Sequence, residues 1–148
     1  MIVLCVLIQT GFSQKNVVGY LPTYSNFPNA IYDVDLNILT HVDIAFVNPD
    51  YNGNIYMPNG LSTVVDVAHA SDVKVLISIA GGAGDKDVYR TILSNNTLMH
   101  HFVDQLVQAT LQNSLDGVDV DIEGNILNGV DVTAWQYEDF IVTLGVAL

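Results

Sequence analysis

One stretch near the carboxyl end of the chain decides the fold, and it reads Asp116-Gly117-Val118-Asp119-Val120-Asp121-Ile122-Glu123-Gly124. Acidic residues alternate with β-branched apolar ones, which predicts a strand, and Gly124 permits a turn directly after it. Because side chains alternate between the two faces of a strand, Asp119, Asp121 and Glu123 share one face. Three carboxylates on one face repel one another and are costly to desolvate. We therefore expect a carboxyl group with a raised pKa at the end of this strand.

The rest of the chain alternates between strand and helix patterns. Apolar, β-rich runs occupy residues 16–21, 40–47 and 72–79, and helical spacing of apolar residues marks 61–69, 96–112 and a last helix from about Thr133. Residues 35–39 predict one further short helix. A strand–helix unit repeated four times predicts an α/β domain, or part of one, with a parallel sheet covered by helices.

Composition narrows the classes of partner. The chain has 148 residues, of which 50% are hydrophobic and 14% charged, and its formal net charge is −12 with only four Lys and Arg residues. This charge excludes nucleic acid and anionic membrane as partners and suits a neutral substrate such as a sugar. Cys5 is the single cysteine, so an intrachain disulfide and a cysteine-based zinc site are both excluded.

The first 14 residues resemble a signal peptide. An apolar run over residues 1–8 is followed by a small-residue processing site near Ser13 or Gln14, although the basic segment that usually begins a signal peptide is missing. The other interpretation is a buried first strand. The run is far shorter than the ~20 residues of a transmembrane helix. We expect a secreted, periplasmic or extracellular protein that begins at about residue 15.

The acidic strand has the chemistry of a glycosidase. A carboxylic acid must protonate the leaving oxygen, and Glu123, at the carboxyl end, is the best candidate. Asp121 can share a proton with Glu123, and Asp119 can support Asp121. A calcium-binding loop fits poorly because its twelfth position, which needs Glu, is Val130. A serine hydrolase built on Ser78 fits poorly because no His has a usable spacing.

The same residues resemble a known family. Asp116 to Glu123 matches in full the DxxDxDxE signature of the glycoside hydrolase family 18 chitinases. The segment Ser78-Ile79-Ala80-Gly81-Gly82 is similar to the serine-and-glycine motif of that family, and Val18-Gly19-Tyr20 and Ala45-Phe46 are similar to its first and second strands. The resemblance covers residues 16 to 148. Ala80 before the two glycines and Gly124 after Glu123 depart from the common pattern.

The resemblance implies a TIM (β/α)8 barrel, of which this chain supplies about the first four βα units. It implies hydrolysis of β-1,4-linked N-acetylglucosamine with retention, in which Glu123 is the general acid, Asp121 orients the 2-acetamido group of the substrate and Asp119 supports Asp121. It implies no metal and no organic cofactor. An endo-β-N-acetylglucosaminidase acting on glycoprotein glycans and a non-catalytic chitin-binding lectin remain alternatives. With half a barrel, the chain by itself is expected to be poorly active or inactive.

Residues around the three central acids are assigned structural or substrate-binding roles. Asp116 and Gly117 are structural members of the motif, and Ser78 is expected to support the acidic residues from the neighbouring strand. Tyr20 and Phe46 either contact sugar or pack inside the barrel. The predicted substrate-binding set is Tyr20, Phe46, Ser78, Gly81 and Gly82. Trp135, at the start of the last helix, is expected to pack against neighbouring helices rather than to line the cleft.

Overall fold

A computed structural model describes residues 15–124, 126 and 132–148, and the predicted signal peptide at residues 1–14 lies outside them. The order of elements confirms the alternation of strands and helices. The strands are β1 (Val18–Pro22), β2 (His41–Ala45), β3 (Lys74–Ala80) and β4 (Gly117–Asp121). The helices are α1 (Leu61–His69), α2 (Lys86–Leu93), α3 (Asn96–Gln112) and α4 (Ala134–Ala147), with 3-10 turns at Asn29–Asp33, Leu36–Ile38 and Gly81–Ala83.

The helix boundaries follow local capping chemistry. The side chain of Asn95 accepts a hydrogen bond from the backbone N–H of Leu98 and begins α3. Thr133 and Gln136 form a reciprocal capping box that begins α4. The sequence analysis left α2 unassigned, although it has a buried apolar side and Asp85 accepts a bond from the N–H of Asp87 at its start. Its position directly after the glycine-rich turn conceals it in the sequence.

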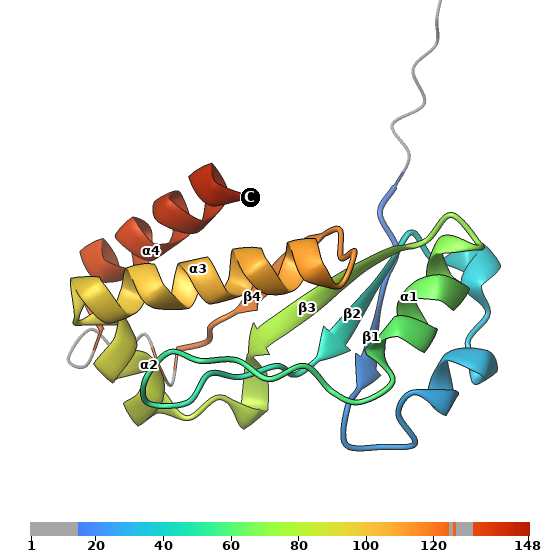
Figure 1. Cartoon of the computed structure of the whole chain (residues 1–148), viewed down its shortest axis with the longest axis horizontal. Helices are drawn as coiled ribbons and strands as arrows, with labels where there is room; N and C mark the ends of the chain where they lie inside the picture. Colours follow the sequence, from blue (N-terminus) through green and yellow to red (C-terminus); the bar gives the residue numbers. More distant parts are fainter. Residues whose placement is uncertain (1–14, 125, 127–131) are drawn as a thin grey trace, which may run out of the picture.

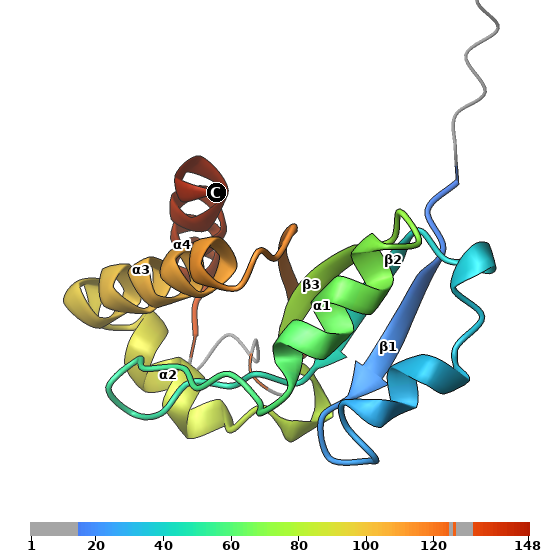
Figure 2. The same cartoon turned by 45° about the vertical axis from the view of Figure 1, so that its right-hand side comes forward.

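The four strands form one parallel sheet in the order β1-β2-β3-β4, so each strand pairs with the next one along the chain. Figure 1 shows this sheet with α1, α3 and α4 arranged beside it, and Figure 2, turned by 45°, shows α1 in front of the strands and running roughly along their direction. Helix α1 packs against β3, α3 packs against β4, and α4 packs against α3 and α2. In the part of the chain that the structure describes, β1 and β4 are the edges of the sheet, which is not closed into a barrel.

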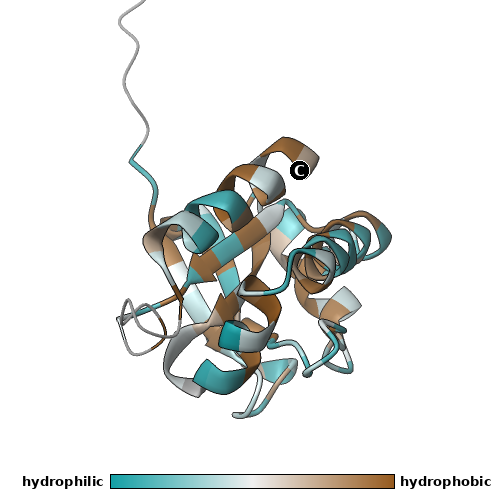
Figure 3. Cartoon of the chain, turned by 90° about the vertical axis from the view of Figure 1, so that its left-hand side faces the viewer, coloured by the Kyte–Doolittle hydropathy of each residue, from teal (hydrophilic) through white to brown (hydrophobic). Residues whose placement is uncertain are grey.

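The two faces of the sheet differ in chemistry. Val75, Ile77 and Ile79 of β3 point toward the helices and are completely buried. The alternate residues of the same strands form the other face, which we call the inner face, and it carries Asp43, Leu76, Ser78, Asp119 and Asp121. Figure 3 shows apolar residues in the strands and along the last turns of α4, where Val142 and Val146 are exposed. The alternation of acidic and apolar residues in the acidic strand therefore places its carboxyl groups on the inner face and its apolar side chains on the other.

Candidate active site at the carboxyl ends of the strands

The acidic motif crosses the carboxyl end of β4. Asp119 and Asp121 lie within the strand on the inner face, and the strand ends before Glu123. Ile122 and Ile126, on either side of Glu123, are buried, and the backbone N–H of Ile126 donates to the carbonyl oxygen of Glu123 at 2.9 Å. The Glu123 side chain itself is exposed. The apolar neighbours thus anchor the backbone, while the carboxyl group of Glu123 remains accessible to a ligand.

Asp119 is held by two hydroxyl groups from other strands. The Oγ of Ser78, its register partner on β3, donates to Asp119 Oδ2 at 2.7 Å. The Tyr20 hydroxyl, from β1 and 99 residues away in sequence, donates to the same oxygen at 3.1 Å. Burial, the hydrogen bond to Asp119 and the nearby carboxylates raise the pKa of Tyr20 to about 12, so the hydroxyl keeps its proton. The expected support of the acidic strand by Ser78 is therefore present as a direct contact.

Phe46 and Gly81 fit against each other beside these carboxylates. Gly81 has a φ of +54°, and a Cβ at this position would lie 2.1 Å from the ring of Phe46. A side chain is therefore excluded at Gly81 both by the backbone conformation and by the ring. At Gly82 an added Cβ would meet no atom within 4 Å. The ring centroid of Phe46 lies 6.5 Å from that of Tyr20, so the two aromatic residues lie side by side at the strand ends.

Two residues that the sequence analysis did not single out hold the glycine segment. Asn48 bonds both backbone groups of Ala80, because its Nδ2 donates to the carbonyl at 3.2 Å and its Oδ1 accepts from the N–H at 2.7 Å. The hydroxyl of Tyr89, on α2, donates to the same Oδ1 at 2.7 Å. Ala80 has φ +72° and ψ −99°, a conformation that a non-glycine residue rarely adopts. Asn48 and Tyr89 thus support a backbone bend that places Gly81 under Phe46.

Asp43 is a further acid that the sequence analysis missed, since it lies within an apolar strand run. It is on the inner face of β2 and only 4% exposed. Its Oδ1 is buried without a hydrogen-bond partner among the described residues. Burial, with a smaller contribution from the charge of Asp119, raises the pKa of Asp43 to about 6. The inner face therefore holds a carboxyl group, that of Asp43, which does not belong to the motif.

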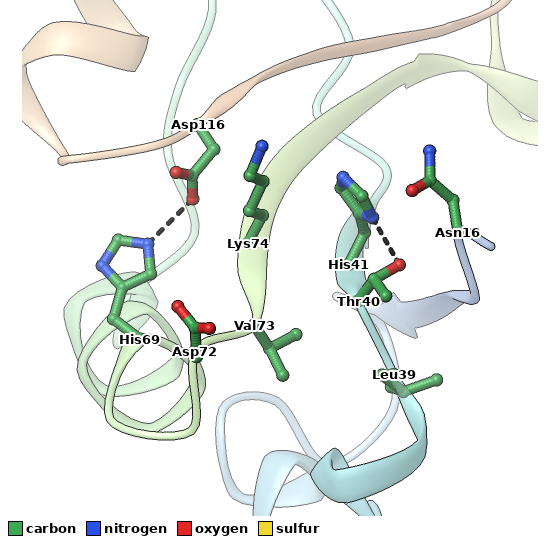
Figure 4. A pocket seen from close by; sticks show the side chains of 9 residues that line it. All are labelled: Asn16, Leu39, Thr40, His41, His69, Asp72, Val73, Lys74 and Asp116. Carbon is green, nitrogen blue, oxygen red and sulfur yellow. Dashed lines mark hydrogen bonds and ion pairs between the residues drawn. The ribbon is translucent and has the colours of Figure 1, made fainter. Parts of the chain in front are cut away.

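Asp116, the first residue of the motif, lies at the opposite end of the strand. Its Oδ2 accepts from the backbone N–H of Val75 at 2.8 Å and lies 2.8 Å from Nε2 of His69 on α1 (Figure 4). Burial raises the pKa of Asp116, but these bonds and the positive charges of His69 and Lys74 outweigh it and hold the pKa below its usual value. Gly117, next to it, pairs with Leu76 of β3. Asp116 fastens the start of β4 to its neighbours.

Asp116 also lines a cavity of about 440 Å³ at the amino ends of the strands, remote from Glu123. Figure 4 shows the residues around it, which are Asn16, Leu39, Thr40, His41, His69, Asp72, Val73, Lys74 and Asp116. A second cavity, of about 520 Å³, lies between α2, α3 and α4. Trp135 borders it and is 71% exposed, so the expectation that Trp135 packs between helices is wrong. The cap at Thr133 begins α4 in an orientation that leaves this indole in solvent.

Within 15–124, 126 and 132–148, no three His, Cys, Asp or Glu side chains are grouped so that they could hold a metal ion. None of the helices over these ranges is long and apolar enough to cross a membrane.

Comparison with known proteins agrees with the resemblance carried by the motifs. The sequence model of the family described as glycosyl hydrolases family 18 matches residues 16–147 of this chain. A class V chitinase of Arabidopsis thaliana is 29% identical over 124 residues, which are 78% of this chain and 32% of that protein. The chain thus spans about a third of the length of this relative.

Solved structures show the same likeness. The family 18 chitinase ChiB of Flavobacterium johnsoniae is 30% identical, with a TM-score of 0.74 over 87% of this chain and 41% of that one. The chitinase-like agglutinin of Robinia pseudoacacia is 25% identical, with a TM-score of 0.73 over 88% of this chain and 40% of that one. The expected fold class is confirmed: the four βα units are part of the TIM-barrel fold of these proteins. The chain belongs to glycosyl hydrolase family 18.

Proposed function

We propose that this chain is the amino-terminal part of a secreted chitinase, which hydrolyses β-1,4-linked N-acetylglucosamine polymers. The observation that carries the proposal is the arrangement at the end of β4. Asp119 is fixed by Ser78 and Tyr20, while Glu123 stands exposed two residues beyond the strand. In a parallel barrel the carboxyl ends of the strands are where substrates react.

The proposed reaction uses the acetamido group of the substrate as nucleophile. Glu123 donates its proton to the glycosidic oxygen, and the leaving sugar departs with that proton. The acetamido carbonyl oxygen attacks the anomeric carbon and forms a cyclic intermediate, which Asp121 orients and stabilises. Glu123, now a carboxylate, takes a proton from the incoming water, and the product retains the configuration of the substrate. Asp119 supports Asp121, and this chain needs no cofactor for any of these steps.

The remaining parts of the proposal concern the full-length protein. The structural relatives reported above are more than twice as long as this chain, and a complete barrel has eight strands. We therefore infer that residues 15–148 by themselves hydrolyse poorly, since half of a barrel cleft is absent from them. Secretion rests on residues 1–14. Amino-terminal sequencing of protein recovered from the medium tests this part, and a mature end near Ser13 or Gln14 supports it.

A lectin is the second candidate, because one of the similar structures is a chitinase-like agglutinin. Full-length protein, with Glu123→Gln as the control, is incubated with chitin oligosaccharides and separately with a high-mannose glycoprotein. Release of N-acetylglucosamine oligomers by the wild type and not by the variant supports the chitinase. Cleavage of the glycoprotein alone overturns it in favour of an endo-β-N-acetylglucosaminidase, and binding without cleavage overturns it in favour of a lectin.

A further inference from the structure

The inference concerns Asp43, the buried acid in the middle of β2. Register places Asp43 between Tyr20 of β1 and Leu76 of β3, one pair of residues closer to the amino ends than Ser78 and Asp119. Its side chain is on the inner face, is 4% exposed, and has an Oδ1 without a hydrogen-bond partner among the described residues. An ionised carboxylate in such a place loses its hydration and gains no compensating bond.

The neighbours of Asp43 offer no compensation for a negative charge. On β1, the Tyr20 hydroxyl is already engaged with Asp119. On β3, the register partner is Leu76, which has no polar group. Two side chains on this face can carry positive charge, those of His41 and Lys74. These residues are opposite each other in the strand register, two positions nearer the amino ends than Asp43 and Leu76, and Lys74 is exposed. The charged group that acts on Asp43 is the carboxylate of Asp119, which has the same sign.

Asp43 and Asp119 therefore have opposite environments. Asp119 accepts two hydrogen bonds, from Ser78 and Tyr20, and such bonds stabilise the ionised form of a carboxyl group. Asp43 accepts none at its buried oxygen, and burial stabilises the neutral form. The surroundings of Asp43 therefore favour its neutral form. The protein thus stores a proton on β2, close to the hydrogen-bonded carboxyl group of Asp119.

We propose that Asp43 is a positioning residue that remains a neutral acid in the working site, and that its ionisation, by adding a second negative charge beside Asp119, limits the site at higher pH. While Asp43 is neutral, no charge on β2 repels Asp119, and Asp119 can support Asp121. Once Asp43 ionises, its negative charge repels the carboxyl group of Asp119 and disturbs the position in which Asp119 supports Asp121. The role in catalysis rests on the proposed function, whereas the stored proton does not.

The pH dependence of stability tests the stored proton. The pKa of Asp43 is raised from its ordinary value of 3.8 to about 6 on folding, so its contribution to stability is complete below about 3.8 and is lost as the pH rises through about 6. Thermal unfolding of the full chain between pH 3.5 and 8 (about the range in which carboxyl groups titrate) is compared for the wild type and Asp43→Asn. Asparagine has the same shape and cannot ionise, so the loss of stability through this window should be smaller in the variant. Asp66→Asn, an exposed acid on α1, should behave as the wild type.

Carboxyl-carbon NMR of the wild-type chain gives a second readout that needs no variant to fold. We expect one aspartate to titrate with a pKa near 6. Its signal should be missing from the spectra of Asp43→Asn, and its pKa should shift toward the ordinary aspartate value in Asp119→Asn. An Asp43 that titrates like an exposed aspartate, or that does not respond to Asp119→Asn, overturns the proposal. Neither measurement needs turnover, so this result and the failure of the proposed chitinase are distinguishable.

The catalytic consequence is measured on full-length enzyme. The alkaline limb of kcat/KM for chitin oligosaccharides should move to higher pH in Asp43→Asn, whereas Asp66→Asn should leave the limb in place. A purely structural role for Asp43 would lower activity at every pH without moving the limb. That outcome would assign Asp43 to packing and overturn its role as a positioning residue.

Discussion

Two acidic residues of the sheet, Asp116 and Asp43, have opposite surroundings. At the amino ends of the strands, Asp116 has a backbone donor, a histidine and a nearby lysine, and its pKa is held below the usual value. In the middle of β2, two strands away in the sheet, Asp43 has a buried oxygen without a hydrogen-bond partner among the described residues, and its pKa is raised to about 6. The first arrangement stabilises the fold, and the second costs stability. The difference shows that the unfavourable burial lies on the inner face, the face that also carries Asp119 and Asp121.

The largest effect is expected at the carboxyl end. In full-length protein, Glu123→Gln should reduce hydrolysis of chitin oligosaccharides by roughly 10²- to 10⁴-fold, because the general acid is removed. Its thermal midpoint should hardly change, since the side chain is exposed. Rates come from chromatography of the products, with Glu138→Gln on α4 as the matched control. A variant that retained wild-type turnover would remove Glu123 from the chemistry.

The next effect concerns the glycine segment that supports this end. Gly81→Ala should lower the free energy of unfolding by about 2–4 kcal/mol, because the added methyl group meets the Phe46 ring and the φ is positive. Gly82→Ala is the matched control and should change stability by less than about 0.5 kcal/mol, since its Cβ meets nothing within 4 Å. Urea denaturation measures both. Equal effects at the two glycines would mean that Phe46 does not constrain the segment.

At the amino end, the expected effect is on stability and depends on pH. Asp116→Ala should cost about 2 kcal/mol near neutral pH, because the N–H of Val75 and the ring of His69 lose their acceptor. Because the folded state lowers the pKa of Asp116, this contribution is present above the pKa of the unfolded chain and is lost as the pH falls through the folded value. The gap between variant and wild type should therefore close in acid. Asp66→Ala, an exposed acid on α1, serves as the control, and a gap independent of pH would contradict the assignment.

The smallest effect is expected at the hydrogen bond between Tyr20 of β1 and Asp119 of β4, the two edge strands. Tyr20→Phe removes one of the two donors to Asp119 but keeps the ring beside Phe46. Because the Tyr20 side chain is 54% exposed and Ser78 still binds Asp119, we expect only a two- to fivefold loss of kcat/KM (about 0.5–1 kcal/mol). The measurement is the same oligosaccharide assay. Tyr24→Phe, at an 82% exposed position, should have no effect, and a larger loss there would indicate a substrate contact near Tyr24.

Local pattern predicted much of this molecule. Helix α3 begins and ends where its apolar spacing predicts, and the four strands fall within or next to their predicted runs. Residues that depend on distant neighbours were missed. Asn48 was not singled out in the sequence, yet its side chain bonds Ala80 and Tyr89, which are 32 and 41 residues away along the chain. Asp43 was missed as one polar residue in an apolar run, because its burial depends on the strands on either side of it.

The sequence by itself determined which residues could share a face, because the period of a strand is two and the motif alternates strictly. It also determined the family, since the acidic signature is complete from Asp116 to Glu123. Only the tertiary structure decided the charge and the partners of each acid. Asp116 gains a histidine and Asp119 gains two hydroxyls, whereas the buried oxygen of Asp43 gains no partner among the residues that the structure describes. The physical reason is that hydrogen bonds and desolvation depend on the strands beside a residue, and these are assembled from distant parts of the chain.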